Sequence, residues 1–208
     1  MGKINVVEHP LLKNSLTIIR SKETAINEFR RHTAIVSQII ITEATKQIPL
    51  REKEIETPLN QMLGHELKTP IVFVPVLRAG ISMLFPAINF ISPSAVGFIG
   101  LERDEQTAIA HEYYQKFPKN LDAGIVIVLD PMLATGGSIS DTISALKRKG
   151  ANTIVVACIV SAPEGLEVLQ KRHPDVNIFT AAIDSHLNES KYIVPGLGDY
   201  GDRYFGTQ

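Results

Sequence analysis

The sequence predicts an α/β fold in which helices flank a central, mostly parallel sheet. From residue 71 onward, short runs of β-branched residues alternate with helix-length segments, a repetition typical of parallel strands joined by right-handed crossovers. Residues 125–129 read Ile-Val-Ile-Val-Leu with no polar residue, so both faces of that strand are expected to be covered. A length of 208 residues allows one domain with an elaboration or two very small ones, and we expect a single domain over 1–208.

The individual elements follow from the spacing of apolar residues. Residues 21–48 repeat them close to a helical period, with Ser21 or Thr24 able to cap the start and Pro49 able to end the helix. We expect an N-terminal helical arm over about residues 1–50. The predicted strands are 71–76, 96–99, 125–129, 153–160 and 177–182, and the predicted helices are 81–90, 138–149 and 165–173. Residues 102–121 are polar without clean periodicity, which indicates a surface hairpin or a mobile functional loop.

Composition excludes several classes of protein. Lys and Arg number 21 against 22 Asp and Glu, so no global field favours nucleic acid or an acidic membrane, and we expect neither as a partner. The lone cysteine, Cys158, excludes an intrachain disulfide and fits a reducing compartment. The first residues hold no continuous apolar signal core. We therefore expect a cytoplasmic protein.

The strongest functional signal is residues 130–138, Asp-Pro-Met-Leu-Ala-Thr-Gly-Gly-Ser, which we call the phosphate loop. It follows a buried strand and opens a helix, so its backbone amides and the helix dipole suit a phosphate monoester. Thr135 and Ser138 can add hydroxyl donors, and Asp130 is placed to accept hydrogen bonds from sugar hydroxyls. A capped glycine turn is the commoner meaning of Thr-Gly-Gly-Ser alone, but the strand and the acid before it favour a ribose 5-phosphate site.

Two other nucleotide motifs do not fit this sequence. No lysine follows the glycines of the phosphate loop, as a P-loop requires. Residues 196–201 match G-x-G-x-x-G, but too few residues follow them to build a dinucleotide-binding βαβ unit.

Three segments resemble the uracil phosphoribosyltransferase family. They are residues 129–138, residues 75–80 (Pro-Val-Leu-Arg-Ala-Gly) and residues 192–199 (Tyr-Ile-Val-Pro-Gly-Leu-Gly-Asp). The resemblance implies a type I phosphoribosyltransferase fold with a small uracil-binding hood at about 184–208 and a mobile lid hairpin at about 102–121. It also implies a pyrimidine salvage reaction in which uracil and 5-phospho-α-D-ribose 1-diphosphate (PRPP) give UMP and pyrophosphate.

The same resemblance implies roles for individual residues. The implied catalytic residues are Arg78 and Arg103, which contact pyrophosphate, Asp130, and Asp199 near the ribose and the base. The implied PRPP contacts are Arg78, Arg103, Asp130, Pro131, Met132, Leu133, Ala134, Thr135, Gly136, Gly137, Ser138 and Asp199. The implied uracil contacts, made largely by main chain, are Ile193, Gly198, Asp199 and Tyr200.

The implied cofactor is Mg²⁺, held mainly through PRPP rather than by a dedicated set of protein ligands, since Mg²⁺ tends to keep waters and bind substrate phosphates. Family members are oligomeric and some respond to GTP. The resemblance therefore implies a homo-oligomer, a dimer or tetramer, and names GTP as a candidate allosteric activator. Residues 21–48 carry more apolar side chains than one sheet face can clearly hide, which suggests dimerisation through that helix.

Two positions compare informatively with related enzymes. Many related phosphoribosyltransferases carry two acids at the strand end, whereas Asp130 is followed by Pro131, as in the uracil branch. Tyr200 stands where a small residue such as alanine is more usual. We expect its main chain to contact the base, because a ring turned inward would shrink the pocket.

Two alternative functions use the same fold. An RNA-binding pyrimidine regulator would want a face rich in Lys and Arg, which the balanced charge disfavours. A phosphoribosyltransferase for another base, such as a purine, is distinguished only by its substrate.

Overall fold

A computed structural model describes residues 2–103, 110–119 and 121–207. One sheet crosses the molecule, and all of its neighbouring strands run parallel except the last pair. In spatial order it contains β1 (Ile4–Val6), β11 (Asn177–Ile183), β10 (Thr153–Ser161), β8 (Ile125–Leu129), β4 (Ile71–Leu77), β6 (Phe98–Arg103) and β7 (Ala110–Lys116). Two short strands join it, β5 (Ala95–Val96) beside β4 and β9 (Met132–Leu133) beside β10. The predicted α/β architecture is confirmed.

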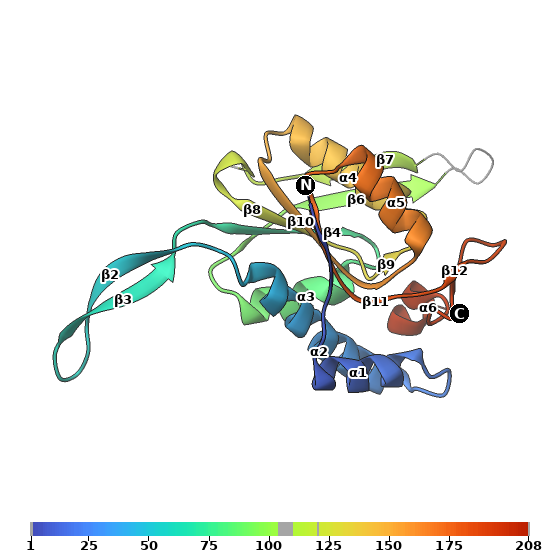
Figure 1. Ribbon diagram of the computed structural model, residues 1–208, viewed down its shortest axis with the longest axis horizontal. Coiled ribbons are helices and arrows are strands. Elements are labelled where there is room, and N and C mark those ends of the chain that lie inside the picture. The colour runs from blue at the N-terminus through green and yellow to red at the C-terminus, as the bar shows by residue number, and fades with distance from the viewer. Residues whose placement is uncertain (1, 104–109, 120, 208) are drawn as a thin grey trace.

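Helices cover both faces of this sheet (Figure 1). One face carries α1 (Pro10–Arg20), α2 (Ile26–Thr45) and α3 (Ile81–Phe90), and the other carries α4 (Gly137–Arg148) and α5 (Pro163–Arg172). A 3-10 turn, η1 (Leu121–Ala123), leads into β8. Among the described residues, we find no helix with the length and apolarity needed to span a membrane.

The central strands divide their side chains between two apolar cores. On β4, Phe73 packs with the core beneath α1, α2 and α3, whereas Val74 packs with the core beneath α4 and α5. On β8, Ile127 and Val128 divide in the same way. Successive strand residues point to opposite faces, so a strand covered twice must be apolar at every position. This double cover explains the uninterrupted apolar run at 125–129.

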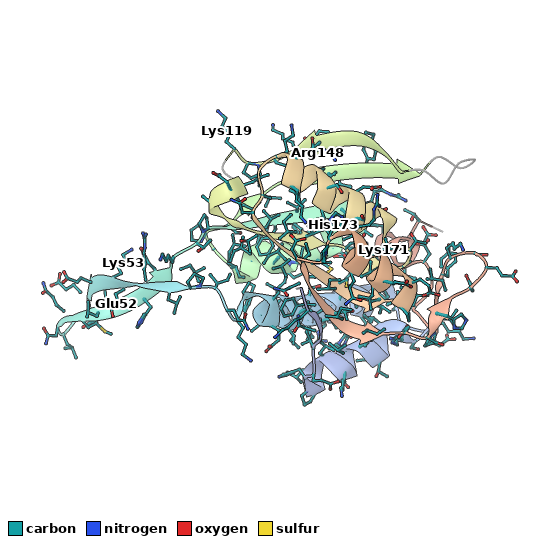
Figure 2. The ribbon with its side chains drawn as sticks, turned by 45° about the horizontal axis from the view of Figure 1, so that its top comes forward. Glu52, Lys53, Lys119, Arg148, Lys171 and His173 are labelled. Atoms are coloured by element: carbon teal, nitrogen blue, oxygen red, sulfur yellow. The ribbon has the colours of Figure 1, made fainter. Side chains whose placement is uncertain are left out.

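Two elements lie outside the central sheet. The strands β2 (Leu50–Glu56) and β3 (Gln61–Leu67) form a long antiparallel hairpin that projects from the body of the molecule (Figure 1). Figure 2 shows Glu52 and Lys53 on this hairpin, away from the helices. The C-terminal region consists of the short strands β12 (His186–Leu187) and β13 (Ile193–Val194), followed by α6 (Tyr200–Phe205).

The structure corrects several sequence expectations. The helix expected over 21–48 spans only Ile26–Thr45, and the arm also contains α1. The chain before Pro10 is not helical, because Ile4–Val6 pairs with β11 at the sheet edge. The β2–β3 hairpin was not predicted. Residues 98–103 and 110–116 pair as an antiparallel hairpin, so the polar segment contains a hairpin, although residues 104–109 lie outside the described part.

Much of the apolar surface of the long helix is covered within this chain. Side chains of α2 that seemed too numerous for one sheet face are also covered by α1 and α3, which pack along it. Val36, Ile40 and Ile41 are fully buried within this chain alone. Contacts inside one chain therefore account for much of the apolar character of the helix, and dimerisation through it stays a prediction.

Replacing Ile40 by alanine tests this packing. Ile40 is 0% exposed, so the substitution is expected to lower the free energy of unfolding by about 3 kcal/mol, through lost burial and a residual cavity. Urea denaturation followed by circular dichroism measures the change. Leu59→Ala is the control: its side chain is 96% exposed, and the expected change is below about 0.5 kcal/mol. Similar losses in the two variants would contradict the proposed core.

Candidate functional site

The site begins where β4 and β8 end side by side. Their parallel register pairs Pro75 with Leu129, so the loops that follow the two strands emerge at one edge of the sheet. Residues 78–80, which we call the Arg78 loop, turn tightly here, and the Gly80 amide donates to the Val76 carbonyl (2.9 Å). A Cβ on Gly80 would lie 2.3 Å from the Leu129 carbonyl oxygen. Only glycine permits this approach, which brings the Arg78 loop against the residue before Asp130.

The phosphate loop has the geometry of an anion site. Its first residues are tied to the sheet, because the Pro131 carbonyl accepts hydrogen bonds from the amides of Ile159 and Val160 (both 3.0 Å). Gly136 then adopts φ 79°, and α4 begins at Gly137. This left-handed turn suits glycine and directs the first amides of α4 toward the loop, where a phosphate would meet the positive end of the helix dipole. The predicted order of strand, acid, loop and helix is confirmed in outline.

Asp130 lies at the apolar junction between β8 and this loop. Its amide donates to the Ala157 carbonyl (3.2 Å), and its carboxylate accepts from the Met132 amide (3.3 Å). Burial raises the pKa of Asp130 to about 7, and the hydrogen bond from Met132 only partly opposes that shift. The Asp130 carboxyl group is therefore desolvated, and within the described part of the chain it forms no ion pair.

Two arginines, Arg20 and Arg203, hold the backbone of residues 193–200, which we call the base segment. Arg20 makes a bidentate contact with the Asp184 carboxylate (2.8 and 2.6 Å) and donates to the Gly196 carbonyl (2.6 Å). Asp184 in turn accepts from the Gly196 amide (2.8 Å), so both polar groups of this peptide position are held. Arg203 donates to the Leu197 carbonyl (2.7 Å). Charge-assisted, forked hydrogen bonds of this kind fix orientation well.

Two adjoining hollows connect these parts. A hollow of about 60 Å³ lies within the phosphate loop. A larger one of about 310 Å³ lies between the Arg78 loop and the base segment, and Met132 and Ala134 line both. The predicted site residues that line one or both hollows are Arg78, Asp130, Met132, Leu133, Ala134, Thr135, Gly136, Ser138, Ile193, Gly198, Asp199 and Tyr200.

Two predicted residues in the described part, Pro131 and Gly137, do not line these hollows. Pro131 is buried, with its carbonyl used by β10, and Gly137 forms the first residue of α4. Arg103 ends β6, and its side chain lies outside the described part of the structure. The Leu133 side chain is fully buried in the core, so this residue can offer only main-chain atoms to a ligand.

Several lining residues were missed by the sequence analysis. They are Ala79, Ile139, Lys191, Tyr192, Gly201 and Phe205. The Tyr192 hydroxyl lies 3.5 Å from the Asp199 carboxylate, whose other oxygen accepts from the Asp202 amide (2.9 Å) and caps α6. The position of Tyr192 directly before Ile193 was a usable signal. Lys191, which brings a positive charge to the larger hollow, had none.

The Tyr200 ring turns away from the solvent-accessible hollow and into the protein. Its side chain and main chain together are only 3% exposed, and the ring stacks on Tyr204 and packs against Phe29. Burial raises the pKa of its hydroxyl well above the usual value for tyrosine. This placement agrees with the expectation that the ring does not reduce the space for a base.

The oxygen donors of the site fit Mg²⁺ brought in by a phosphorylated substrate. Among the residues the structure describes, no three His, Cys, Asp or Glu side chains gather as a metal-ligand group. Mg²⁺ usually keeps several waters and binds one or two carboxylates together with substrate phosphates. Asp130 supplies a carboxylate beside the phosphate loop, so the donor set suits an ion held largely by the ligand.

Comparison with known proteins agrees with this geometry. The family model described as uracil phosphoribosyltransferase matches residues 6–207. The uracil phosphoribosyltransferase of Levilactobacillus brevis is 48% identical over 209 residues, covering 100% of both chains. That of Malacoplasma penetrans is 49% identical over 203 residues, covering 98% of each chain.

Solved structures show the same fold. The AQ2163 protein of Aquifex aeolicus superposes with a TM-score of 0.94 at 36% identity, covering 99% of each chain. A hypoxanthine-guanine phosphoribosyltransferase from Bacillus anthracis matches with a TM-score of 0.53 at 12% identity, covering 76% of this chain and 80% of that one, which supports the type I phosphoribosyltransferase fold alone. With a family model that spans nearly its whole length, this chain belongs to the uracil phosphoribosyltransferase family.

Proposed function

We propose that this protein transfers the 5-phosphoribosyl group of PRPP to N1 of uracil, forming UMP and releasing pyrophosphate. The observation that carries the proposal is that the two hollows adjoin: Met132 and Ala134 line both the hollow within the phosphate loop and the one between the Arg78 loop and the base segment. A ligand with a phosphate at one end and a transferable group at the other suits this arrangement. A volume of about 310 Å³ is within the range of small-molecule sites.

Each part of PRPP has a suitable partner. The 5-phosphate binds at the amides that open α4, and Thr135 and Ser138 add hydroxyls. Asp130 accepts hydrogen bonds from the ribose hydroxyls. Arg78, exposed at the rim of the larger hollow, binds the pyrophosphate group, and Arg103 joins it from the hairpin. Uracil binds against the main chain at Ile193 and from Gly198 to Tyr200.

The proposed reaction is a direct displacement at the anomeric carbon. Uracil N1 forms the new bond to the anomeric carbon as the bond to pyrophosphate breaks, the N1 proton passes to water, and positive charge develops on the ribose ring in the transition state. Carboxylates at Asp130 and Asp199 stabilise that charge, while Arg78 and Arg103 stabilise the departing anion. Bound Mg²⁺ supplies further neutralisation of the diphosphate. Lys191 lines the same hollow and adds to its positive charge.

The wider proposal includes the architecture and setting of the enzyme. Residues 1–208 act as a single domain, with residues 102–121 as a lid that excludes water and residues 184–208 as a uracil-binding hood. The reaction serves pyrimidine salvage in the cytoplasm, which agrees with a lone, buried cysteine. Homo-oligomerisation and activation by GTP are included on the strength of the family resemblance.

A panel of free bases tests the activity. Release of pyrophosphate from PRPP is measured with uracil, cytosine, hypoxanthine and adenine, with and without Mg²⁺ and GTP. We expect turnover with uracil that depends on Mg²⁺ and rises with GTP, and at least 100-fold lower kcat/KM for the other bases. Preference for hypoxanthine would contradict the proposal. Tight, sequence-dependent binding of pyrimidine leader RNA in a gel shift would favour the regulator instead.

Arg78→Ala tests the role given to the Arg78 loop. Loss of a charge-assisted contact to the leaving group is expected to lower kcat/KM about 100-fold, or about 2.7 kcal/mol of transition-state stabilisation. Arg148→Ala is the matched control, because Arg148 is exposed at the end of α4 (Figure 2). Its activity should equal that of the wild type. If Arg78→Ala stays within about tenfold, Arg78 does not stabilise the departing pyrophosphate.

The buried Asp130 carboxyl group predicts how the stability of the protein depends on pH. In an unfolded chain Asp130 would ionise near pH 4, whereas burial raises its pKa in the folded protein to about 7. A raised carboxyl pKa lowers the free energy of unfolding at every pH where the unfolded form is ionised. This loss of stability grows between about pH 4 and pH 7 and stays constant above pH 7. Three units correspond to about 4 kcal/mol, and partial contact with solvent reduces that to about 2 kcal/mol.

Asp130→Asn is therefore expected to stabilise the free protein while abolishing most activity. The gain in the free energy of unfolding should be about 2 kcal/mol at pH 8 and below about 1 kcal/mol at pH 5, because less of the ionisation penalty exists at the lower pH. Chemical denaturation at the two pH values measures it. Asp122→Asn, at an exposed position in η1, should show no such difference. Destabilisation of Asp130→Asn at pH 8 would contradict the account.

A further inference from the structure

We propose that Tyr200 is a positioning residue whose hydroxyl couples occupation of the base segment to the position of the Arg78 loop. The link is a buried hydrogen-bond relay: the Tyr200 hydroxyl donates to Ser82 Oγ (2.8 Å), and Ser82 Oγ donates to the Ala79 carbonyl (2.7 Å). The inference rests on the proposed function, because it assigns uracil and pyrophosphate to the two ends of this relay.

The two ends of the relay both belong to the larger hollow. Tyr200 lies in the base segment directly after Asp199, and Ala79 lies directly after Arg78. All four residues line that hollow. Ser82, on the first turn of α3, lies between them and is itself 0% exposed. The two hydrogen bonds therefore connect the base segment to the Arg78 loop through the buried Ser82.

The relay admits one consistent order of donors and acceptors. The Ala79 carbonyl can only accept, so the Ser82 proton is committed to it, and Ser82 Oγ is left to accept from Tyr200. Thr33 Oγ1 lies 3.4 Å from the Tyr200 hydroxyl, on the side of α2. The Tyr200 side chain is buried, so its hydroxyl hydrogen-bonds to these two side chains rather than to water.

Because the relay is buried, it can couple the position of the base segment to that of the Arg78 loop. A hydroxyl that loses its partner in a dry site costs far more than one that can turn to water. Phe29 and Tyr204 also pack against the Tyr200 ring, with distances of 5.4 and 5.9 Å between ring centroids. Shifting the base segment therefore shifts the hydroxyl, and either the Arg78 loop shifts with it or the buried hydrogen bond between Tyr200 and Ser82 is lost. Uracil that orders residues 198–200 consequently orders the loop that carries Arg78.

The coupling is measured with uracil and magnesium pyrophosphate, which cannot react because neither contains ribose. Isothermal titration calorimetry gives the Kd of pyrophosphate with and without saturating uracil. Allosteric couplings typically change affinity 5- to 150-fold. We expect uracil to tighten pyrophosphate binding at least fivefold in the wild type and less than twofold in Tyr200→Phe, which keeps the ring and removes only the hydroxyl.

Two further single variants and one double variant separate coupling from stability. Tyr204→Phe removes a phenol hydroxyl from the same helix and should retain the wild-type coupling. Ser82→Ala breaks the middle of the relay and should abolish it, and the double variant with Tyr200→Phe should be no worse than either single variant, since both cut one relay. Thermal unfolding of each variant is recorded beside its coupling, because a merely structural role would lower the melting temperature and leave the coupling factor unchanged.

The outcomes are decisive. The inference is overturned if uracil leaves the pyrophosphate Kd of the wild type unchanged, or if Tyr200→Phe keeps the fivefold effect. Formation of UMP from PRPP and uracil by the same wild-type preparation shows whether the proposed function stands. A preparation that makes UMP without the coupling refutes the relay alone, whereas one that makes no UMP refutes the proposed function itself.

Discussion

The parallel pairing of β4 with β8 is the contact on which the whole site depends. It ends two strands at one sheet edge, and the missing side chain of Gly80 lets the next loop lie against the Leu129 carbonyl. Arg78 and Asp130 are therefore neighbours in space although they are far apart in the sequence. A shift in this pairing would separate Arg78 from Asp130, the proposed contacts to the leaving group and the sugar, because each lies among the first residues after its strand.

Double coverage of the sheet has an electrostatic consequence at this edge. The apolar packing around β8 also limits the access of water to the first residue beyond it, and this desolvation raises the pKa of Asp130 to about 7. A carboxylate in such a place interacts strongly with charge that develops nearby, since little solvent screens it. Stability and activity thus oppose each other at one residue, as is common where functional groups are buried.

The sequence predicted those parts of the protein whose signals are local. The strand at 125–129 and the helix at 81–90 were predicted with their observed limits, because apolar runs and turn residues bound them closely. The phosphate loop was predicted because its acid, hydroxyls and glycines are contiguous. In contrast, β1 is only three residues long, and β2 reads Leu-Arg-Glu-Lys-Glu-Ile-Glu with every position exposed, so neither offers a buried face as a signal. Three of the missed lining residues, Lys191, Gly201 and Phe205, could be assigned to the site only once the fold of the C-terminal region was known.

The C-terminal region also shows why a local signal could not reveal the whole site. Its base segment rests on residues from the other end of the chain: Arg20 holds Gly196, while Phe29 and Thr33 surround the Tyr200 side chain. The pairs lie more than 160 positions apart, and no periodicity or motif connects them. The N-terminal helices therefore contribute to the site without lining either hollow. They provide the rigid surface that orients the main-chain groups of the base segment, which are the groups proposed above to bind the base.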